Sequence, residues 1–389
     1  MTLFNNEAQD AVCLILIKSG TLILQGCSLS VESIKKNSLK YKVPCIYQMA
    51  DTCSFIQKCS FRGGGLHKAD TAGIYNKNGN SLIQNCQFHQ FQSGGVIADL
   101  AARNIFVFRD NAIVSCSATG LYIEGEGAQP VILHNVFMVC KCSSIIINTR
   151  VDALIAMNEM QINGVGIEII NNKSIVFENT IQKCHDDGIA VKGNSETHLA
   201  QPTIQKNYIE ASTHNGIVCE GFSSCPLIKA NIIEANRKSG IKMIDSARAH
   251  IGGHTLADRE DKRSHLDFKA HAALYAQLFE DIVADGAYRD VMTIFYEVLE
   301  ATAEFKEQVL QHLNDGKVPM GNLIHQNYCQ GILLEEGCAA DIISNHLIKN
   351  IKANIALGGQ NSGDTKIKFN HIEKSKQEGI FVVEGEKDL

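Results

Sequence analysis

The strongest constraint on this chain is a recurring pair of residues, an Asn followed nine positions later by a Gly. Full copies are Asn111/Gly120, Asn179/Gly188, Asn207/Gly216, Asn231/Gly240, Asn322/Gly331 and Asn370/Gly379. Weaker copies are anchored on Asn135, Asn158 and Asn345, and Cys86 and Ser54 fit as substituted anchors. An internal repeat of this kind predicts similar structural units that stack on one another along the chain.

Apolar residues fill four columns around these anchors, at three residues before and at two, ten and twelve residues after. In two successive repeats the columns hold Val176, Ile181, Ile189 and Val191, then Ile204, Ile209, Ile217 and Cys219. Short alternating patterns of this type predict half-buried strands, and three of them in one repeat leave no room for a crossover helix. Each strand must therefore pair with its counterpart one repeat on. The sequence predicts an all-β solenoid, a right-handed single-stranded parallel β-helix of about 11–12 coils.

The anchors are expected to stack on one another in the predicted solenoid. Asn tolerates a tight bend and its amide can hydrogen-bond along a column, whereas Gly is expected to supply a positive φ where a strand begins. Five residues after the anchor, a second column of small polar residues contains Cys, which we expect to fill space in the core. The predicted structural ladder consists of Asn111, Asn135, Asn179, Asn207, Asn231, Asn322, Asn345, Asn370, Cys116, Cys140 and Cys184.

Composition indicates the cellular compartment and the kinds of ligand to expect for this chain. It has 14 Cys but no Cys-x-x-Cys pair, so we predict reduced thiols, no metal site and no cofactor. The apolar run from Ala11 to Ile17 reads as a strand rather than a secretory signal, and no run is long enough for a membrane helix. A net charge of −6 offers no electrostatic footprint for nucleic acid. These features predict a cytoplasmic protein.

The repeat resembles that of the parallel β-helix repeat proteins, a superfamily of carbohydrate-binding proteins and sugar hydrolases. The resemblance covers nearly the whole chain outside one insertion. It is carried most clearly by Asn179-Thr-Ile-Gln-Lys-Cys-His-Asp-Asp-Gly-Ile189 and Asn207-Tyr-Ile-Glu-Ala-Ser-Thr-His-Asn-Gly-Ile217. This repeat motif is most similar to that of the intracellular branch, which includes the repeat region of some F-box proteins and solenoid proteins of protists. The resemblance is specific for fold and says little about function.

The strand pattern is interrupted once, in residues 253–318. Two stretches there, 258–285 and 287–314, have apolar residues at the three- and four-residue spacing of amphipathic helices. A Gly separates the two stretches, and a Gly and a Pro follow the second. We therefore predict an α-helical hairpin insertion in this segment.

The insertion divides the β-helix into coils at 1–252 and coils at 319–389. Residues 255–316 contain 6 Lys or Arg and 13 Asp or Glu, so nearly all of the excess acidity of the chain lies there. Either the hairpin packs with a solvated acidic face, or it docks a basic surface of a partner protein. The ends of the solenoid are further candidate binding surfaces, because unpaired strand edges are normally covered.

The resemblance implies that an enzyme of this fold would cut acidic polysaccharides with carboxylates and basic groups on neighbouring coils. The best candidates lie in one turn of three successive coils. They are Asp186 and Asp187, then His214, then Arg237 and Lys238. Paired carboxylates in such a turn would act as general acid and base around a glycosidic bond.

The known enzyme motifs are incomplete in this chain. A polygalacturonase would carry Asn-x-Asp, Gly-His-Gly and Arg-x-Lys, whereas this chain has Asn148-Thr149-Arg150 and Thr213-His214-Asn215-Gly216. We find no clear Ca²⁺-binding set for a pectate lyase, and Trp is absent. We therefore expect a non-enzymatic scaffold that binds other proteins in a cytoskeletal or ciliary assembly. The alternative is a carbohydrate-active enzyme, a hydrolase or lyase, centred on Asp186, Asp187, His214 and Lys238.

Overall fold

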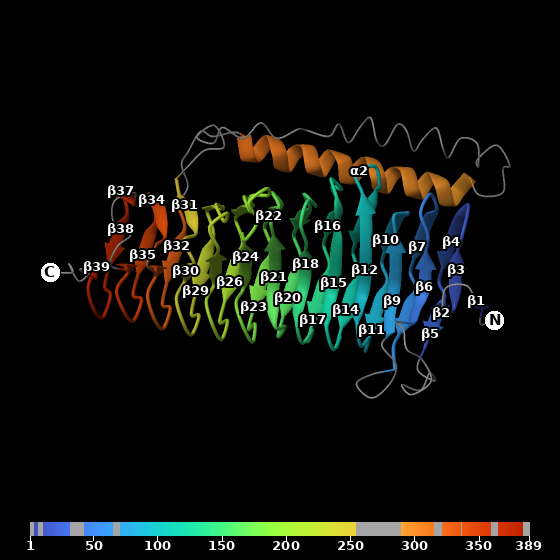
Figure 1. Cartoon of the computed structure of the whole chain (residues 1–389), viewed down its shortest axis with the longest axis horizontal. Coiled ribbons are helices and arrows are strands. Elements are labelled where there is room, and N and C mark those ends of the chain that lie inside the picture. The colour runs from blue at the N-terminus through green and yellow to red at the C-terminus, as the bar shows by residue number, and fades with distance from the viewer. Residues whose placement is uncertain are drawn as a thin grey trace. The chain divides into compact units, whose positions relative to one another are not determined.

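The computed structural model describes residues 4–6, 11–31, 43–64, 71–253, 289–314, 321–335, 337–358 and 365–383. The chain forms two compact units, one of residues Met1–His254 with Met320–Leu389 and the other of residues Thr255–Pro319. The larger unit is a solenoid in which each regular coil contributes one strand to each of three parallel sheets (Figure 1). The predicted all-β parallel solenoid is therefore confirmed.

The described strands form these three parallel sheets and one antiparallel pair, β1 (Phe4–Asn6) with β2 (Ala11–Cys13). The first sheet contains β4 (Thr21–Gln25), β7 (Cys53–Gln57), β10 (Asn80–Gln84), β13 (Phe106–Arg109), β16 (Val131–Leu133), β19 (Leu154–Ala156), β22 (Ile175–Phe177), β25 (Thr203–Gln205), β28 (Leu227–Lys229), β31 (Arg248–Gly252), β34 (Ala339–Ile343) and β37 (Lys366–Lys368). The second contains β5 (Ser28–Ser30), β8 (Ser60–Arg62), β11 (Gln87–His89), β14 (Ala112–Val114), β17 (Val136–Met138), β20 (Glu159–Gln161), β23 (Thr180–Gln182), β26 (Tyr208–Glu210), β29 (Ile232–Glu234), β32 (Leu323–His325), β35 (His346–Ile348) and β38 (His371–Glu373). The third contains β3 (Ile15–Ile17), β6 (Val43–Gln48), β9 (Thr71–Lys77), β12 (Gly94–Ala101), β15 (Thr119–Glu126), β18 (Ser143–Ile147), β21 (Val165–Ile170), β24 (Ile189–Lys192), β27 (Ile217–Glu220), β30 (Ile241–Ile244), β33 (Ile332–Leu334), β36 (Ile355–Leu357) and β39 (Ile380–Val382).

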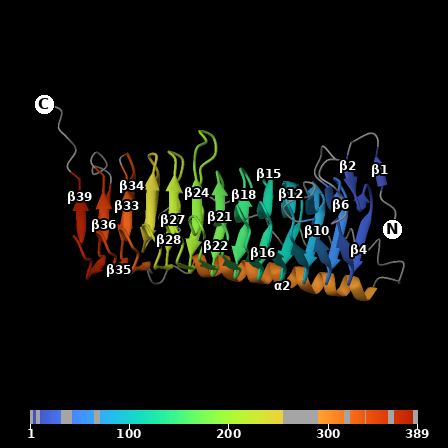
Figure 2. The same ribbon diagram turned by 90° about the horizontal axis from the view of Figure 1, so that it is seen from below.

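The core of the solenoid is a set of apolar columns in exact coil-to-coil alignment along the axis. Figure 2 shows the strands of successive coils lying side by side in order of sequence. Ile181 pairs with Ile209 in the second sheet and Ile189 pairs with Ile217 in the third, and all four side chains are fully buried. The last described coil differs, because Val382 is 48% exposed and no further described strand pairs with β39.

The anchor asparagines form one continuous hydrogen-bonded column. Asn179 Nδ2 donates to Asn207 Oδ1 at 3.0 Å, and the same oxygen accepts the backbone N–H of Asn179 at 3.0 Å. Each such side chain is buried or nearly so, and the pattern satisfies backbone groups that the turn would otherwise leave unpaired. The column runs through Asn111, Asn135, Asn158, Asn179, Asn207, Asn231, Asn322, Asn345 and Asn370.

Thiols replace amides in the N-terminal part of this column. The backbone N–H of Cys59 contacts Cys86 Sγ at 3.4 Å, and the backbone N–H of Cys86 donates to Asn111 Oδ1 at 2.8 Å. Cys59 is therefore the anchor of its coil. The assignment of Ser54 as that anchor is wrong, because Ser54 lies in β7 and pairs with Ser81. All 14 cysteines are free thiols.

The second predicted column also lies in the interior of the solenoid. Cys116, Cys140 and Cys184 are buried in it. The backbone N–H of Cys140 donates to Asn163 Oδ1 at 2.7 Å, so thiol and amide side chains occupy the same stacked turn.

The recurring Gly has a different role from the one predicted. Gly188 and Gly216 are not among the glycines with positive φ. A Cβ on Gly216 would lie 2.4 Å from Ile233 Cγ2 and 2.7 Å from the carbonyl oxygen of Gly240. Close approach of the next coil, rather than backbone conformation, therefore requires Gly here. Positive φ falls instead on non-Gly residues immediately before the anchor and four residues after it, such as Lys206 at 56° and Ala211 at 57°.

The insertion contains the described helix α2 (Arg289–Asn314), which confirms the second of the two predicted helices. The first predicted helix, 258–285, lies outside the described residues, so the hairpin stays a prediction. The solenoid continues in register across the insertion, because β29 pairs with β32 and Asn231 Nδ2 donates to Asn322 Oδ1 at 2.9 Å. Within the part of the chain that is described, no helix has the length and apolar character that crossing a membrane requires.

Candidate functional site

The candidate residues lie in a turn that repeats from coil to coil. Asp186 and Asp187 lie between β23 and β24, and His214 lies in the equivalent turn of the next coil, between β26 and β27. The turn stays stacked because the backbone N–H of His214 donates to Asp186 O at 3.2 Å and that of Lys238 donates to His214 O at 2.9 Å. Equal spacing from their anchors therefore places these residues above one another along the solenoid axis.

Two carboxylates and one imidazole meet in this turn. One carboxylate oxygen of Asp186, one of Asp187 and one ring nitrogen of His214 all lie within 4.8 Å of one another, and all three residues are half-buried. His214 Nδ1 contacts the Asp186 carboxylate directly. The carboxylate Oδ1 of Asp187 accepts hydrogen bonds from both N and Nδ2 of Asn215, each at 2.8 Å. Three oxygen and nitrogen ligands of this kind could also hold a divalent metal ion.

The environment of Asp187 favours its protonated form. Burial raises the pKa of the Asp187 carboxyl above its ordinary value and the negative charge of Asp186 adds to the rise, although hydrogen bonds from Asn215 and the charge of His214 oppose it. A carboxyl with a raised pKa beside an imidazole held by a second carboxylate is an arrangement suited to acid–base chemistry.

Lys192 supplies a positive charge close to this turn, and sequence reasoning missed it. Its Nζ lies 2.6 Å from Glu168 Oε1, and the side chain remains 40% exposed. Burial alone would lower the pKa of Lys192, but the hydrogen bond and charge of Glu168, with the charges of Glu220 and Asp186, raise it above its ordinary value. Lys192 lies on the outer face of the third sheet and not in the turn column of Asp186 and His214, so the spacing of that column does not predict it.

The other two candidates are not drawn into the cluster. Arg237 and Lys238 lie in the next turn along the axis and both are exposed. Lys238 is aligned with His214 through its backbone, and within the described residues its side chain has no recorded contact with Asp186 or Asp187. The structure therefore brings together Asp186, Asp187 and His214 and leaves Lys238 at the edge of the group.

A cavity of about 740 Å³ lies at a different turn, after the third-sheet strands β12, β15 and β18, and its lining includes Asp99, Glu126, Thr149, Arg150 and His198. Arg150 Nη1 lies 2.5 Å from Glu126 Oε1, and Arg150 Nε donates to His198 Nε2 at 2.7 Å. Arg150 is thus engaged by Glu126 and His198, and within the described residues the cavity brings together no pair of carboxyl groups with an imidazole like that of the Asp186 turn. The sequence signal for this cavity is the column of residues at and just after the ends of the third-sheet strands.

The sequence and fold were compared with known proteins. Residues 1–160 and 146–256 match the family model described as right handed beta helix region. No match is found among the curated proteins. Two crystal structures of variants of the periplasmic alginate epimerase AlgG are similar, with TM-scores of 0.52 and 0.53 and identities of 14% and 13%. Each alignment covers 96% of this chain and 72% of that chain, and at this identity it shows the fold.

These similarities correct the expectation of a non-enzymatic scaffold. The two solved structures named above, which share the fold over 96% of this chain, are those of an alginate epimerase. The alternative reading, a carbohydrate-active enzyme, is the better supported of the two, and its placement at Asp186, Asp187 and His214 stays a prediction. The intracellular branch and the cytoplasmic location stay predictions.

Proposed function

The chain belongs to the right-handed β-helix family, and on that premise we propose that it is a lyase that acts on a uronate-containing polysaccharide. The observation that carries the proposal is the half-buried Asp187 carboxyl, with its raised pKa, beside the Asp186–His214 pair. Fold similarity to an alginate epimerase supports a uronate polymer as the substrate class. The reaction type is argued from the positions of the side chains.

Each side chain in the turn has a separate task in this proposal. Asp186 orients His214 through Nδ1, so Nε2 is the ring nitrogen that takes a proton from the substrate. Asp187 holds a proton to higher pH than an ordinary Asp and is the general acid. Lys192 stays positively charged and partly exposed, so it pairs with the carboxylate of the sugar.

The reaction begins at the sugar carbon next to the carboxylate. His214 Nε2 removes the proton from that carbon, and the electron pair moves into the carboxylate, where Lys192 stabilises the second negative charge. The pair then returns to form a carbon–carbon double bond and expels the glycosidic oxygen, which takes the proton from Asp187. The products are a shortened chain and an unsaturated sugar end, with no oxidant or reductant required.

The spacing of the side chains favours elimination over two other reactions. Epimerisation needs a base and an acid on opposite faces of the sugar, whereas atoms of His214 and Asp187 lie within 4.8 Å of each other. Inverting hydrolysis needs carboxyl groups about 6.5–9.5 Å apart to leave room for a water molecule. Carboxylate oxygens of Asp186 and Asp187 lie within 4.8 Å of each other, which leaves no such room.

The outer face of the third sheet supports a polymer rather than a single sugar as the ligand. Tyr47 and Tyr75 stack there with ring centroids 5.2 Å apart and an interplanar angle of 14°. Aromatic faces of this kind are apolar platforms on which sugar rings can pack. The strand of Tyr75, β9, lies five coils from β24, and at about 4.8 Å per coil this is a span of several sugar units.

The proposal is tested by incubating the protein with alginate, polygalacturonate and other uronate polymers. Three readouts are followed: ultraviolet absorbance of unsaturated sugar ends, new reducing ends, and configuration at the carbon next to the carboxyl by NMR. We expect absorbance and reducing ends to rise together on at least one polymer. Asp187→Asn and His214→Gln should each lower the rate by at least about 100-fold.

The matched control is Glu378→Gln, because Glu378 precedes Gly379 as Asp187 precedes Gly188, but it is exposed. This variant should keep the full rate. A full rate in Asp187→Asn, or no turnover of any polymer, would refute the proposal. Inverted sugars without unsaturated ends would keep the substrate class and refute elimination.

A further inference from the structure

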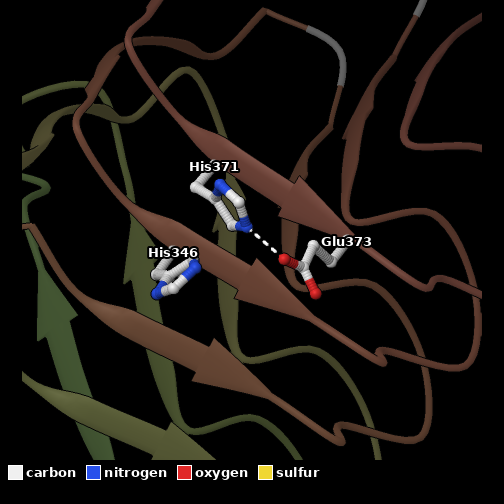
Figure 3. A group of neighbouring side chains, drawn as sticks. All are labelled: His346, His371 and Glu373. Carbon is white, nitrogen blue, oxygen red and sulfur yellow. Dashed lines mark hydrogen bonds and ion pairs between the residues drawn. The ribbon is translucent and has the colours of Figure 1, made fainter.

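Two histidines and a glutamate come together on the outer face of the second sheet, far along the chain from the Asp186 turn. His346 begins β35 and His371 begins β38, and these two residues are directly paired in the parallel ladder. Glu373 follows His371 by two residues in the same strand, so its side chain lies on the same face. Figure 3 shows the three side chains gathered over these two neighbouring strands.

The contacts within this group bring nitrogen and oxygen atoms toward a common point. His371 Nε2 and Glu373 Oε1 share a hydrogen bond, drawn in Figure 3. The rings of His346 and His371 are 4.3 Å apart between centroids and nearly perpendicular, at 78°. One ligand atom from each of the three residues lies within 4.8 Å of the others. Both histidines are exposed, so an ion could reach the group from solvent.

The chemistry of this set matches a transition-metal ion better than a hard cation. Zinc takes imidazole nitrogen and carboxylate oxygen at about 2.0–2.2 Å, and ligand atoms on a tetrahedral ion then lie about 3.3–3.5 Å apart. Small rotations of the side chains bring atoms that already lie within 4.8 Å to that separation. Mg²⁺ and Ca²⁺ prefer all-oxygen sites, which two imidazoles do not provide.

We propose that His346, His371 and Glu373 form a binding site for a divalent transition-metal ion of the zinc class. The ion takes the place of the hydrogen bond between His371 Nε2 and Glu373 Oε1 and binds both of these atoms. Three protein ligands leave one position of a tetrahedral ion open to water or to an outside ligand.

The Asp186 turn is a weaker candidate for the same ion. It offers one imidazole and two carboxylates, and the Oδ1 atom of Asp187 already accepts two hydrogen bonds from Asn215. In the C-terminal group, Glu373 Oε2 lies 3.9 Å from Lys374 Nζ, too far for a hydrogen bond. The metal site is independent of the proposed lyase activity, because the Asp186 turn follows β23 and β26, whereas the histidine group lies on β35 and β38.

The site is tested by titrating the full chain with Co²⁺, whose visible absorption reports its ligands, and then by displacing Co²⁺ with Zn²⁺. We expect one tightly bound ion per chain, with visible absorption but without the near-ultraviolet band that thiolate ligands give. His346→Gln and His371→Gln should each weaken binding by at least about tenfold. The control is His134→Gln, which removes an exposed histidine of another coil and should leave binding unchanged.

Two results would overturn the proposal. One is binding that is equally tight in both histidine variants, and the other is a thiolate band that accounts for all of the bound cobalt. Unchanged circular dichroism of the variants guards against loss of fold as the cause of weaker binding. The lyase assay, run with and without Zn²⁺, separates failure of this site from failure of the proposed activity.

Discussion

At the scale of single residues, stability depends on buried polar groups that must all be paired. Asn207 shows this most clearly: its Oδ1 accepts two hydrogen bonds from Asn179, and its Nδ2 donates to Asn231 Oδ1 and to the carbonyl of Val176, all at 3.0 Å. A buried group left without its partner costs about 1–3 kcal/mol. The ladder is therefore sensitive at every rung to loss of its amide.

Asn207→Ala should lower the free energy of unfolding by about 2–4 kcal/mol, because it leaves the backbone N–H of Asn179 and the carbonyl of Val176 unpaired. Urea unfolding followed by circular dichroism measures the change. The control is Asn194→Ala, whose exposed side chain can exchange its partner for water, and it should change stability by no more than about 0.5 kcal/mol. Equal losses in the two variants would contradict a special role for the ladder.

The raised pKa of Asp187 predicts a pH dependence of stability with a definite sign. Because burial raises the folded-state pKa above that of the unfolded chain, the contribution of Asp187 is complete below the unfolded pKa and is lost as pH rises through the folded pKa. Asp187→Asn removes that loss. Its free energy of unfolding, relative to the wild type, should therefore increase as pH rises from about 4 to 7. Parallel stability curves for the two proteins would contradict the raised pKa.

At the scale of elements, the bends between strands store backbone strain. Ile162 and Val139 have φ of 56° and 60°, in a region that β-branched residues rarely occupy. Each lies four residues after its anchor, at a bend that the coil repeats whatever residue is present. The packing of the flanking strands thus imposes a conformation that the local sequence does not favour.

Ile162→Asn should raise the free energy of unfolding by about 1 kcal/mol, because Asn adopts the left-handed region at lower cost. The matched control is Ile232→Asn. Ile162 and Ile232 are both 40% exposed, but Ile232 lies in a strand, β29, and is not among the residues with positive φ. The control should lower stability, and thermal unfolding of the two variants side by side measures the difference. A loss in both would mean that the strain at Ile162 is negligible.

Much of the fold could be predicted from sequence because a β-helix repeats its burial pattern in every coil. The fixed spacing of Ile181 and Ile189 from their anchor Asn in the sequence matches the positions of these two residues in the paired strands of successive coils. The predicted repeat is wrong at Ser54, because thiols and not amides are the anchors of the first coils. With Ser54 as the anchor, Cys59 falls five residues later in the second column, whereas in the structure Cys59 is itself the anchor. The role of Gly was misassigned because a close approach by the next coil leaves no mark in the sequence of one coil.

The candidate sites were predictable to different degrees. Asp186, Asp187 and His214 fall in one turn column, so their meeting could be predicted from spacing alone. Lys192 could not, because its charge state depends on Glu168 in the preceding coil. The group of His346, His371 and Glu373 could not be predicted from local Cys motifs, because its members come from paired strands of neighbouring coils.

At the scale of the whole molecule, the insertion enters the solenoid at a single bend. In the next coil one residue, Ser344 with φ of 57°, joins β34 to the anchor Asn345. Gly253 makes the corresponding hydrogen bond, from its N–H to Ile343 O at 2.8 Å, as Ser344 does to Lys368 O at 3.0 Å. Gly253 therefore occupies the same bend position as Ser344. Asn322 is the anchor that corresponds to Asn345, so it is the residue that would follow Gly253 in an uninterrupted coil.

A chain that lacks residues 254–321, with Gly253 joined directly to Asn322, should keep the β-helix fold. The expected result is an unchanged strand signal in far-ultraviolet circular dichroism and a cooperative thermal transition. The control removes residues 254–322, which deletes the anchor and shifts the following strands by one position, so inward residues would face outward. That control should lose much of its stability. Loss of fold in the first deletion would show that the insertion is needed by the solenoid.

The single direction of the Asn ladder has an electrical consequence. From Asn111 to Asn345 each rung donates one amide N–H to the oxygen of the following rung and turns its own oxygen toward the preceding coil. Amide dipoles aligned head to tail add, as peptide dipoles do along an α-helix. The solenoid interior therefore has an axial polarity, negative toward the N-terminal coils and positive toward the C-terminal ones. The two directions along the axis differ in potential even though the backbone repeats evenly.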